Sequence, residues 1–92
     1  MQNARVQVDS EAAASVHENG VVILHIGKGR VYAANETGAR IWHGIVQQQQ
    51  LHTIAAEISD EYQIPMSLAC EHVGAFVSQL ERHCLVQRQE IL

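Results

Sequence analysis

The sequence has few aromatic residues and no long apolar run, and each shortage narrows what the chain can do. Only four aromatic residues are present in 92, so a core has to be built mainly from Val, Ile, Leu and Ala. No apolar stretch approaches the about 20 residues that cross a bilayer. The first ten residues, MQNARVQVDS, also lack the apolar core of a signal peptide. We therefore expect a cytoplasmic protein without a membrane partner.

Positive charge is also in short supply. Six Lys and Arg residues stand against ten Asp and Glu residues, which gives a formal net charge of −4. A surface of that sign repels the phosphates of nucleic acids and anionic lipids. We therefore expect no nucleic-acid partner.

Cysteines and histidines do not form a metal-binding pattern. Cys70 and Cys84 form neither a CxxC pair nor a disulfide framework. With His72 and His83 they make the closest Cys/His group, but it is spread over two distant turns of one expected helix, whereas structural zinc sites use closely spaced ligand pairs. The spacing predicts no metal site and no other cofactor.

Independent catalysis is not expected either. The pairs Cys70/His72 and His83/Cys84 are adjacent or two residues apart on a helix, so their side chains point to different sides and cannot easily form a nucleophile–base pair. No glycine-rich phosphate loop, carboxylate pair or HExxH motif is present. We therefore predict a protein that is not an enzyme.

The first third of the chain has strand patterns. ARVQVDS alternates valine with polar residues, VVILHI is a β-branched run, and RVYAA follows the short turn GKG as a hairpin partner. These patterns predict strands within residues 4–10, 21–26 and 30–34. Residues 11–20, EAAASVHENG, are expected to form a looser connection.

The remainder of the chain has helical periodicity. Asn35 is a suitable N-cap for a first helix, and Glu36 follows where the helix dipole favours negative charge. A second helix starts near Leu51 and ends before Pro65, and a third starts at Pro65 or Ser67 and closes at HCLV. The tail QRQEIL is expected to be flexible. We predict a single domain over residues 1–92, with a core at about 4–86. Its fold class is α+β and winged helix-turn-helix-like, with a three-stranded antiparallel sheet followed by three helices (βββααα).

Three segments, GRVYAANETGARIW, LHTIAAEISDEYQI and HVGAFVSQLERHCLV, resemble the PqqD family in their order and motifs. The resemblance covers about residues 20–86. It implies a non-catalytic RiPP recognition element, which binds the leader segment of a ribosomally made precursor peptide. The resemblance further implies delivery of that peptide to a separate modifying enzyme such as a radical-SAM enzyme, protease or cyclase. The product would belong to PQQ, lasso-peptide or related biosynthesis.

The sequence departs from the family pattern at three informative positions. Ala34 stands where the family usually has Leu, His72 where many members have Asp, and Cys84 where Gly is expected after the last helix. An imidazole at position 72 would make binding depend on pH. A left-handed backbone at Cys84 would cost about 1 kcal/mol, so either the last helix ends differently here or some strain is tolerated.

An exposed strand edge offers unpaired N–H and C=O groups to which an extended peptide can add as a further strand. We expect this edge to be the strand at residues 30–34, with the third helix beside it. The predicted peptide-binding residues are Lys28, Arg30, Val31, Tyr32, Ala33, Ala34, Leu68, His72, Val73 and Phe76. Of these, Val73 and Phe76 also fit a place in the core, and Lys28 and Arg30 fit edge protection as well as attraction of acidic leader residues.

Two other functions use the same fold. A winged-helix DNA-binding regulator would read DNA with residues 66–83, but Arg82 is the only fixed positive charge there. A protein–protein adaptor would use the strand edge to pair with itself. The sequence leaves open a monomer or a strand-exchanged homodimer.

Overall fold

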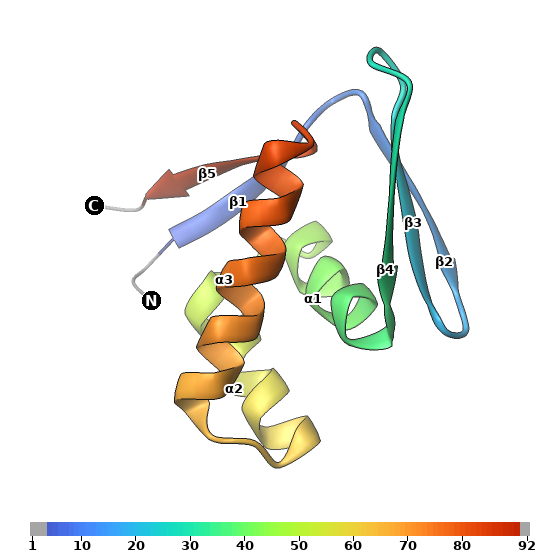
Figure 1. The fold of residues 1–92 in the computed structure, drawn as a ribbon. Coiled ribbons are helices and arrows are strands. Elements are labelled where there is room, and N and C mark those ends of the chain that lie inside the picture. Colours follow the sequence, from blue (N-terminus) through green and yellow to red (C-terminus); the bar gives the residue numbers. More distant parts are fainter. Residues whose placement is uncertain (1–3, 91–92) are drawn as a thin grey trace.

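The computed structural model describes residues 4–90 and has five strands and three helices in that range (Figure 1). In chain order the elements are β1 (Ala4–Val8), β2 (Ala12–His17), β3 (Gly20–His25), β4 (Arg30–Asn35), α1 (Glu36–Val46), α2 (Leu51–Tyr62), α3 (Met66–Arg82) and β5 (Val86–Glu90). The predicted fold, three antiparallel strands followed by three helices, is confirmed, and a second sheet is added to it.

The three-stranded sheet has the order β2-β3-β4. Its first strand lies within residues 11–20, so the prediction of a loose connection there was wrong. The sequence did not predict this strand, because it begins with Ala12, Ala13 and Ala14. Alanine is depleted in strands, and the segment has little alternation of apolar and polar residues. Pairing with the apolar strand β3, which sets Val16 opposite Val21, overrides that weak local preference.

The second sheet joins the two ends of the chain. β1 pairs with β5 in antiparallel fashion, with Val8 opposite Val86 (Figure 1). The prediction of residues 4–10 as a member of the three-stranded sheet was therefore wrong. Residues 87–90, which were expected to form a tail outside the core, belong to a strand. The last two residues of that expected tail lie outside the described range.

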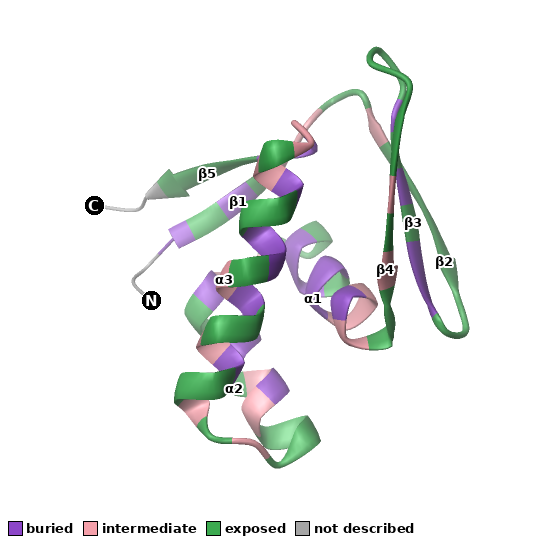
Figure 2. Cartoon of the chain, viewed as in Figure 1, coloured by how far each residue is buried: buried purple, intermediate pink, exposed green. Residues whose placement is uncertain are grey.

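The helices pack on one face of the three-stranded sheet (Figure 1). The core lies between the helices and β3, and β1 and the start of β5 contribute to it (Figure 2). Val21 and Ile23 are the fully buried β3 side chains of this core. The largest fully buried side chains from the helices are Ile41, Ile45, Leu51, Ile54, Ile58, Val73, Val77 and Leu80. This set confirms that aliphatic side chains form most of the core.

Helix ends follow the local sequence. The side chain of Asn35 accepts a hydrogen bond of 3.0 Å from the backbone N–H of Gly38, which confirms Asn35 as the N-cap of α1. After α3, Cys84 has the left-handed backbone that its place after the last helix suggested, with φ of 60°. A left-handed conformation disfavours any residue with a Cβ, so Cys84 stores local strain.

An ion-pair network connects α1 with α2. The guanidinium of Arg40 donates from Nη2 to Glu57 at 2.6 Å and from Nε to Glu61 at 2.8 Å. The hydrogen bond to Glu57 raises the pKa of Arg40 above its ordinary value, and burial opposes that rise. The network holds the start of α1 beside the end of α2, and both segments border the site described next.

Candidate functional site

One edge of the three-stranded sheet is open. β4 pairs with β3 on one side, and within residues 4–90 no strand pairs with it on the other. In an antiparallel strand, alternate N–H and C=O groups point away from the paired neighbour. The outer edge of β4 therefore presents a row of unpaired backbone donors and acceptors to a further strand.

A groove of about 530 Å³ lies beside this edge. Its walls come from β4, the start of α1, the end of α2, the loop that follows α2, and α3. The residues that line it are Tyr32, Ala33, Ala34, Asn35, Thr37, Gly38, Ile41, Ile58, Tyr62, Ile64, His72 and Phe76. Five of the ten predicted site residues are therefore brought together here.

Two aromatic contacts form one end of the groove wall. The ring of Tyr32 lies 6.1 Å from that of Phe76 and 5.0 Å from that of His83, measured between centroids and tilted in both cases. Phe76 is only 8% exposed, so it belongs to the core and also lines the groove. Such tilted contacts fix the position of the tyrosine ring over the third helix.

The register of β4 decides which side chains face the helices. Tyr32 is opposite the fully buried Ile23, which places Tyr32 on the helix side of the sheet. Val31 and Ala33 alternate with it and lie on the other face, where Val31 is 61% exposed. Val31 and Ala33 were predicted to contact the peptide, but their side chains lie on the face away from the helices, so they can reach a peptide in the groove only through the backbone edge of β4.

Small residues open the groove where β4 turns into α1. A Cβ placed on Gly38 would lie 2.6 Å from the Cβ of Ala34 and 3.0 Å from Cε1 of Phe76. Gly38 therefore lies so close to Ala34 and Phe76 that no larger side chain fits at position 38 unless its neighbours move. A leucine at position 34, as the resemblance led us to expect, would project into this part of the groove.

The remaining predicted residues lie away from the groove lining. Val73 is fully buried in the core, which is the alternative place that the sequence analysis gave for it. Leu68 is 37% exposed on α3. Lys28 and Arg30 are exposed at the turn end of the β3–β4 hairpin, where Nζ of Lys28 donates to Sγ of Cys84 at 3.0 Å.

Sequence reasoning missed the contributions of α1 and α2 to the groove. Thr37, Ile41, Ile58, Tyr62 and Ile64 all line it. The exposed Tyr62, followed by the short QIP segment, belongs to the motif that carried the family resemblance and was the one available signal. Apolar residues such as Ile58 look like ordinary core residues in a periodic helix, and only packing shows that they also line a groove.

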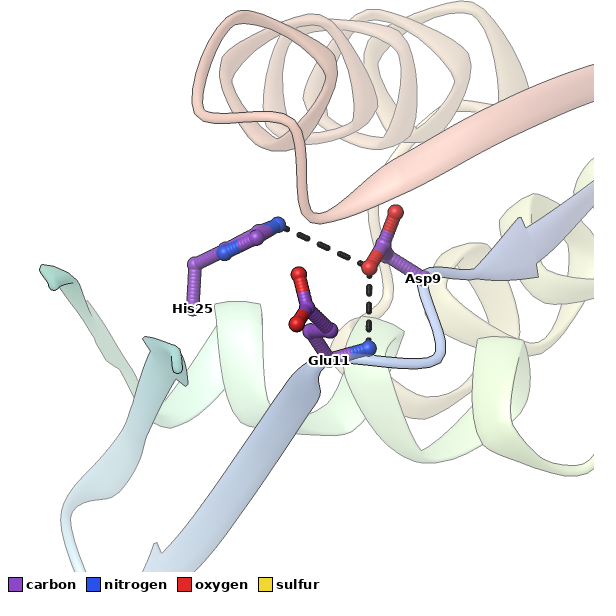
Figure 3. A group of neighbouring side chains, drawn as sticks. All are labelled: Asp9, Glu11 and His25. Carbon is purple, nitrogen blue, oxygen red and sulfur yellow. Dashed lines mark hydrogen bonds and ion pairs between the residues drawn. The ribbon is translucent and has the colours of Figure 1, made fainter. Parts of the chain in front are cut away.

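Asp9, Glu11 and His25 form a cluster at another part of the molecule (Figure 3). Their ligand-type atoms lie within 4.8 Å of one another. The Nδ1 atom of the buried His25 accepts the backbone N–H of Lys28 at 3.1 Å, so a neutral ring carries its proton on Nε2, 3.5 Å from Oδ1 of Asp9. A metal on Nε2 would have to replace that proton. The cluster therefore fits a structural contact between the β1–β2 connection and the β3–β4 turn better than a metal centre.

A second groove, of about 740 Å³, lies between β1, β2 and α1. Its lining includes Val8, Ala14 and Trp42. The edge of β2 borders this groove as the edge of β4 borders the first. Within residues 4–90 the three-stranded sheet therefore has two open edges, and experiments have to distinguish them.

Comparisons with known proteins agree with this architecture. The family model described as "Coenzyme PQQ synthesis protein D (PqqD)" matches residues 20–86. The solved structure "TbiB1 in Complex with the TbiA(beta) Leader Peptide" is similar with a TM-score of 0.83 and 20% identity, over 88% of this chain and 94% of that chain. The structure "Lasso peptide synthetase B1 complexed with the leader peptide" is similar with a TM-score of 0.82 and 19% identity, over 90% of this chain and 98% of that chain.

At such identities the two structures show a shared fold. No curated protein matches the sequence significantly. None of the helices found in residues 4–90 is long and apolar enough to cross a membrane.

Proposed function

Since this chain belongs to the PqqD family, we propose that it binds the leader segment of a ribosomally made precursor peptide. The leader adds as a strand to the open edge of β4, and one or more of its side chains enter the groove beside that edge. The open edge with an adjoining groove of about 530 Å³ is the observation that carries this proposal.

In strand addition, the backbone and the side chains of the peptide contribute to binding in different ways. The main-chain groups of β4 supply hydrogen bonds that do not depend on the peptide sequence, whereas the groove selects side chains. An added strand points alternate side chains to the helix side of the sheet. The leader residues on that side reach the space over Ala34 and Gly38, next to Phe76.

The groove lining indicates the chemistry of the selected side chain. Its inner residues are apolar, among them Ile41, Ile58 and Phe76, so a large apolar leader side chain fits best. His72 is exposed and lines the groove, and it offers a polar contact to the peptide. Lys28 and Arg30 lie at the turn end of β4 and favour acidic leader residues there.

The two similar structures support this proposal, because each of them is a complex with a leader peptide. The groove residues of this chain do not include a pair of residues arranged as a nucleophile and its base. We therefore propose a non-catalytic role in which the protein holds the leader and presents the precursor to a separate modifying enzyme. The pathway is of the PQQ, lasso-peptide or a related type.

A titration of the precursor tests the proposal. The probe is the N-terminal half of a short precursor peptide encoded beside this protein's gene, measured by isothermal titration calorimetry. We expect one-to-one binding that its C-terminal half does not show. Equal binding of both halves, or of neither, would contradict leader recognition.

DNA binding is tested in parallel with random duplex at low salt. A winged-helix regulator would shift the duplex under those conditions, whereas a surface with a net charge of −4 should not. A shift of the duplex together with no binding of the precursor would favour the regulator.

A further inference from the structure

β3 is apolar on both faces, although helices cover only one of them. Val21 and Ile23 point into the core, whereas Val22 and Leu24 alternate with them on the opposite face. A strand with one solvated face normally alternates apolar and polar residues, and an apolar run on both faces is typical of a strand covered on both sides. The sequence of β3 therefore indicates that another protein surface packs on the face of β3 that the helices leave exposed.

The uncovered side of the sheet is an apolar surface, which we name the outer face. In the strand registers its central residues are Ala13 and Ser15 of β2, Val22 and Leu24 of β3, and Val31 and Ala33 of β4. The register row nearest α1 adds His17, Gly20 and Asn35, and the ring of His17 lies within hydrogen-bond distance of the Ser15 hydroxyl at 3.0 Å. Val22 is 37%, Leu24 38% and Val31 61% exposed. Figure 1 shows that no described element packs over this side. None of the six central side chains carries a charge, and the polar His17 and Asn35 lie at one end, so the outer face has an apolar centre with a polar border, as an interaction site does.

The outer face is continuous with the edge of β4. Val31 and Ala33 belong to both, because their backbone forms the edge and their side chains lie on the outer face. A peptide strand added to β4 would extend the sheet by about 4.8 Å. Its outward side chains would then continue the outer face, so that a partner lying there contacts the protein and the bound leader together.

We propose that the outer face is the docking surface for the enzyme that modifies the precursor peptide. This inference rests on the function proposed above. The partner's contacting surface is apolar and uncharged, to match the six residues it covers. Binding across the outer face gives the enzyme a way to distinguish leader-bound from free protein, since only the leader-bound form has the extended sheet.

The size of the outer face favours such a partner over a second copy of this chain. Three strands of six residues cover about 20 by 14 Å, or roughly 280 Å². A stable interface buries about 800 Å² on each partner, and smaller contacts belong to transient complexes. Transient contact suits an enzyme that has to release one carrier and accept the next.

Site-specific photo-crosslinking in cells that make the mature product tests this inference. A benzophenone amino acid replaces Leu24 on the outer face, Thr37 in the groove, or Val46 as a control. Val46 is an apolar residue of α1 that is 50% exposed and lines the second groove, not the outer face, so it also reports on that rival site. We expect position 24 to capture an enzyme, identified by mass spectrometry, that acts on peptides. Position 37 is expected to capture the precursor, and position 46 neither.

The outcomes separate the two proposals. Failure of position 37 to capture a precursor contradicts the proposed function, whatever position 24 shows. Capture of a second copy at position 24, of an enzyme at position 46 alone, or of nothing at position 24 overturns the docking surface.

Substitutions give an independent readout. L24K introduces a charge at a side chain that is already 38% exposed, so the fold should be retained, as judged by thermal unfolding. We expect L24K to bind the leader as the parent does and to reduce precursor modification at least tenfold, whereas V46K leaves modification unchanged. Full modification with L24K would overturn the inference.

Discussion

Gly38 packs so closely against Ala34 that a Cβ on Gly38 would lie 2.6 Å from the Cβ of Ala34. This contact joins the end of β4 to the first turn of α1, at the base of the groove. It keeps the strand edge and the helices at the spacing that leaves the groove open. The contact therefore links local chain geometry directly to the proposed binding site.

Gly38→Ala should destabilise the protein by about 1–2 kcal/mol, because Ala34 and Phe76 have to move to admit the new methyl group. Peptide affinity should also fall, since the methyl group lies in the groove. Chemical unfolding in urea and calorimetric titration measure the two effects.

Gly74 provides the matched control, because a Cβ there meets no atom within 4 Å. Gly74→Ala in the middle of α3 should stabilise the protein by about 1 kcal/mol and leave peptide binding unchanged. Equal stability changes for the two variants would contradict the importance of the Gly38–Ala34 contact.

Proline at two adjacent positions of β4 tests the strand edge. Of Ala33 and Ala34, one N–H points toward β3 and the other points outward. Proline at the outward position should preserve the circular dichroism spectrum and weaken leader binding at least tenfold, because it removes a donor and blocks the approach of a strand. Proline at the other position should destabilise the fold.

The same substitution in β2 separates the two sheet edges. We expect Ser15→Pro or Ala14→Pro, whichever keeps the fold, to bind the leader with unchanged affinity. If proline in β2 abolished leader binding while proline in β4 left it unchanged, the second groove would be the binding site.

His72 should make leader binding depend on pH. A protonated imidazole adds a positive charge at the groove, so affinity for an acidic leader should be higher at pH 5.5 than at pH 8. His72→Gln should remove this dependence. His52→Gln, on the exposed side of α2, should keep it, and a pH dependence that persists in His72→Gln would assign the effect to another group.

Cys84→Gly should stabilise the protein by about 1 kcal/mol, because a residue with φ of 60° no longer carries a Cβ. Cys84→Ala retains the Cβ and should give no such gain. It also removes the thiol that accepts from Lys28, so comparison of the two variants isolates the backbone effect. Thermal unfolding under reducing conditions measures the difference, and equal melting temperatures would argue against strain at this position.

Local physical chemistry made part of this structure readable in advance. The N-cap at Asn35, the three helices, the hairpin of β3 and β4 and the left-handed residue at Cys84 all depend on neighbouring residues. The edge strand of the candidate site was found for the same reason. The motifs around it also sufficed to indicate the family.

Other features depend on contacts between distant residues. β2 is hidden by its alanines until β3 pairs with it, and β1 pairs with β5 across almost the whole chain. The facing of Val31 and Tyr32 depends on a strand register that a one-residue shift would invert. Periodicity cannot show which apolar residue of a helix lines a groove. The sequence alone thus determined the three helices, the β3–β4 hairpin and the strand that forms the site edge, because their signals are local. The tertiary structure decided the second sheet, the groove and the outer face, because these arise only when separate elements pack.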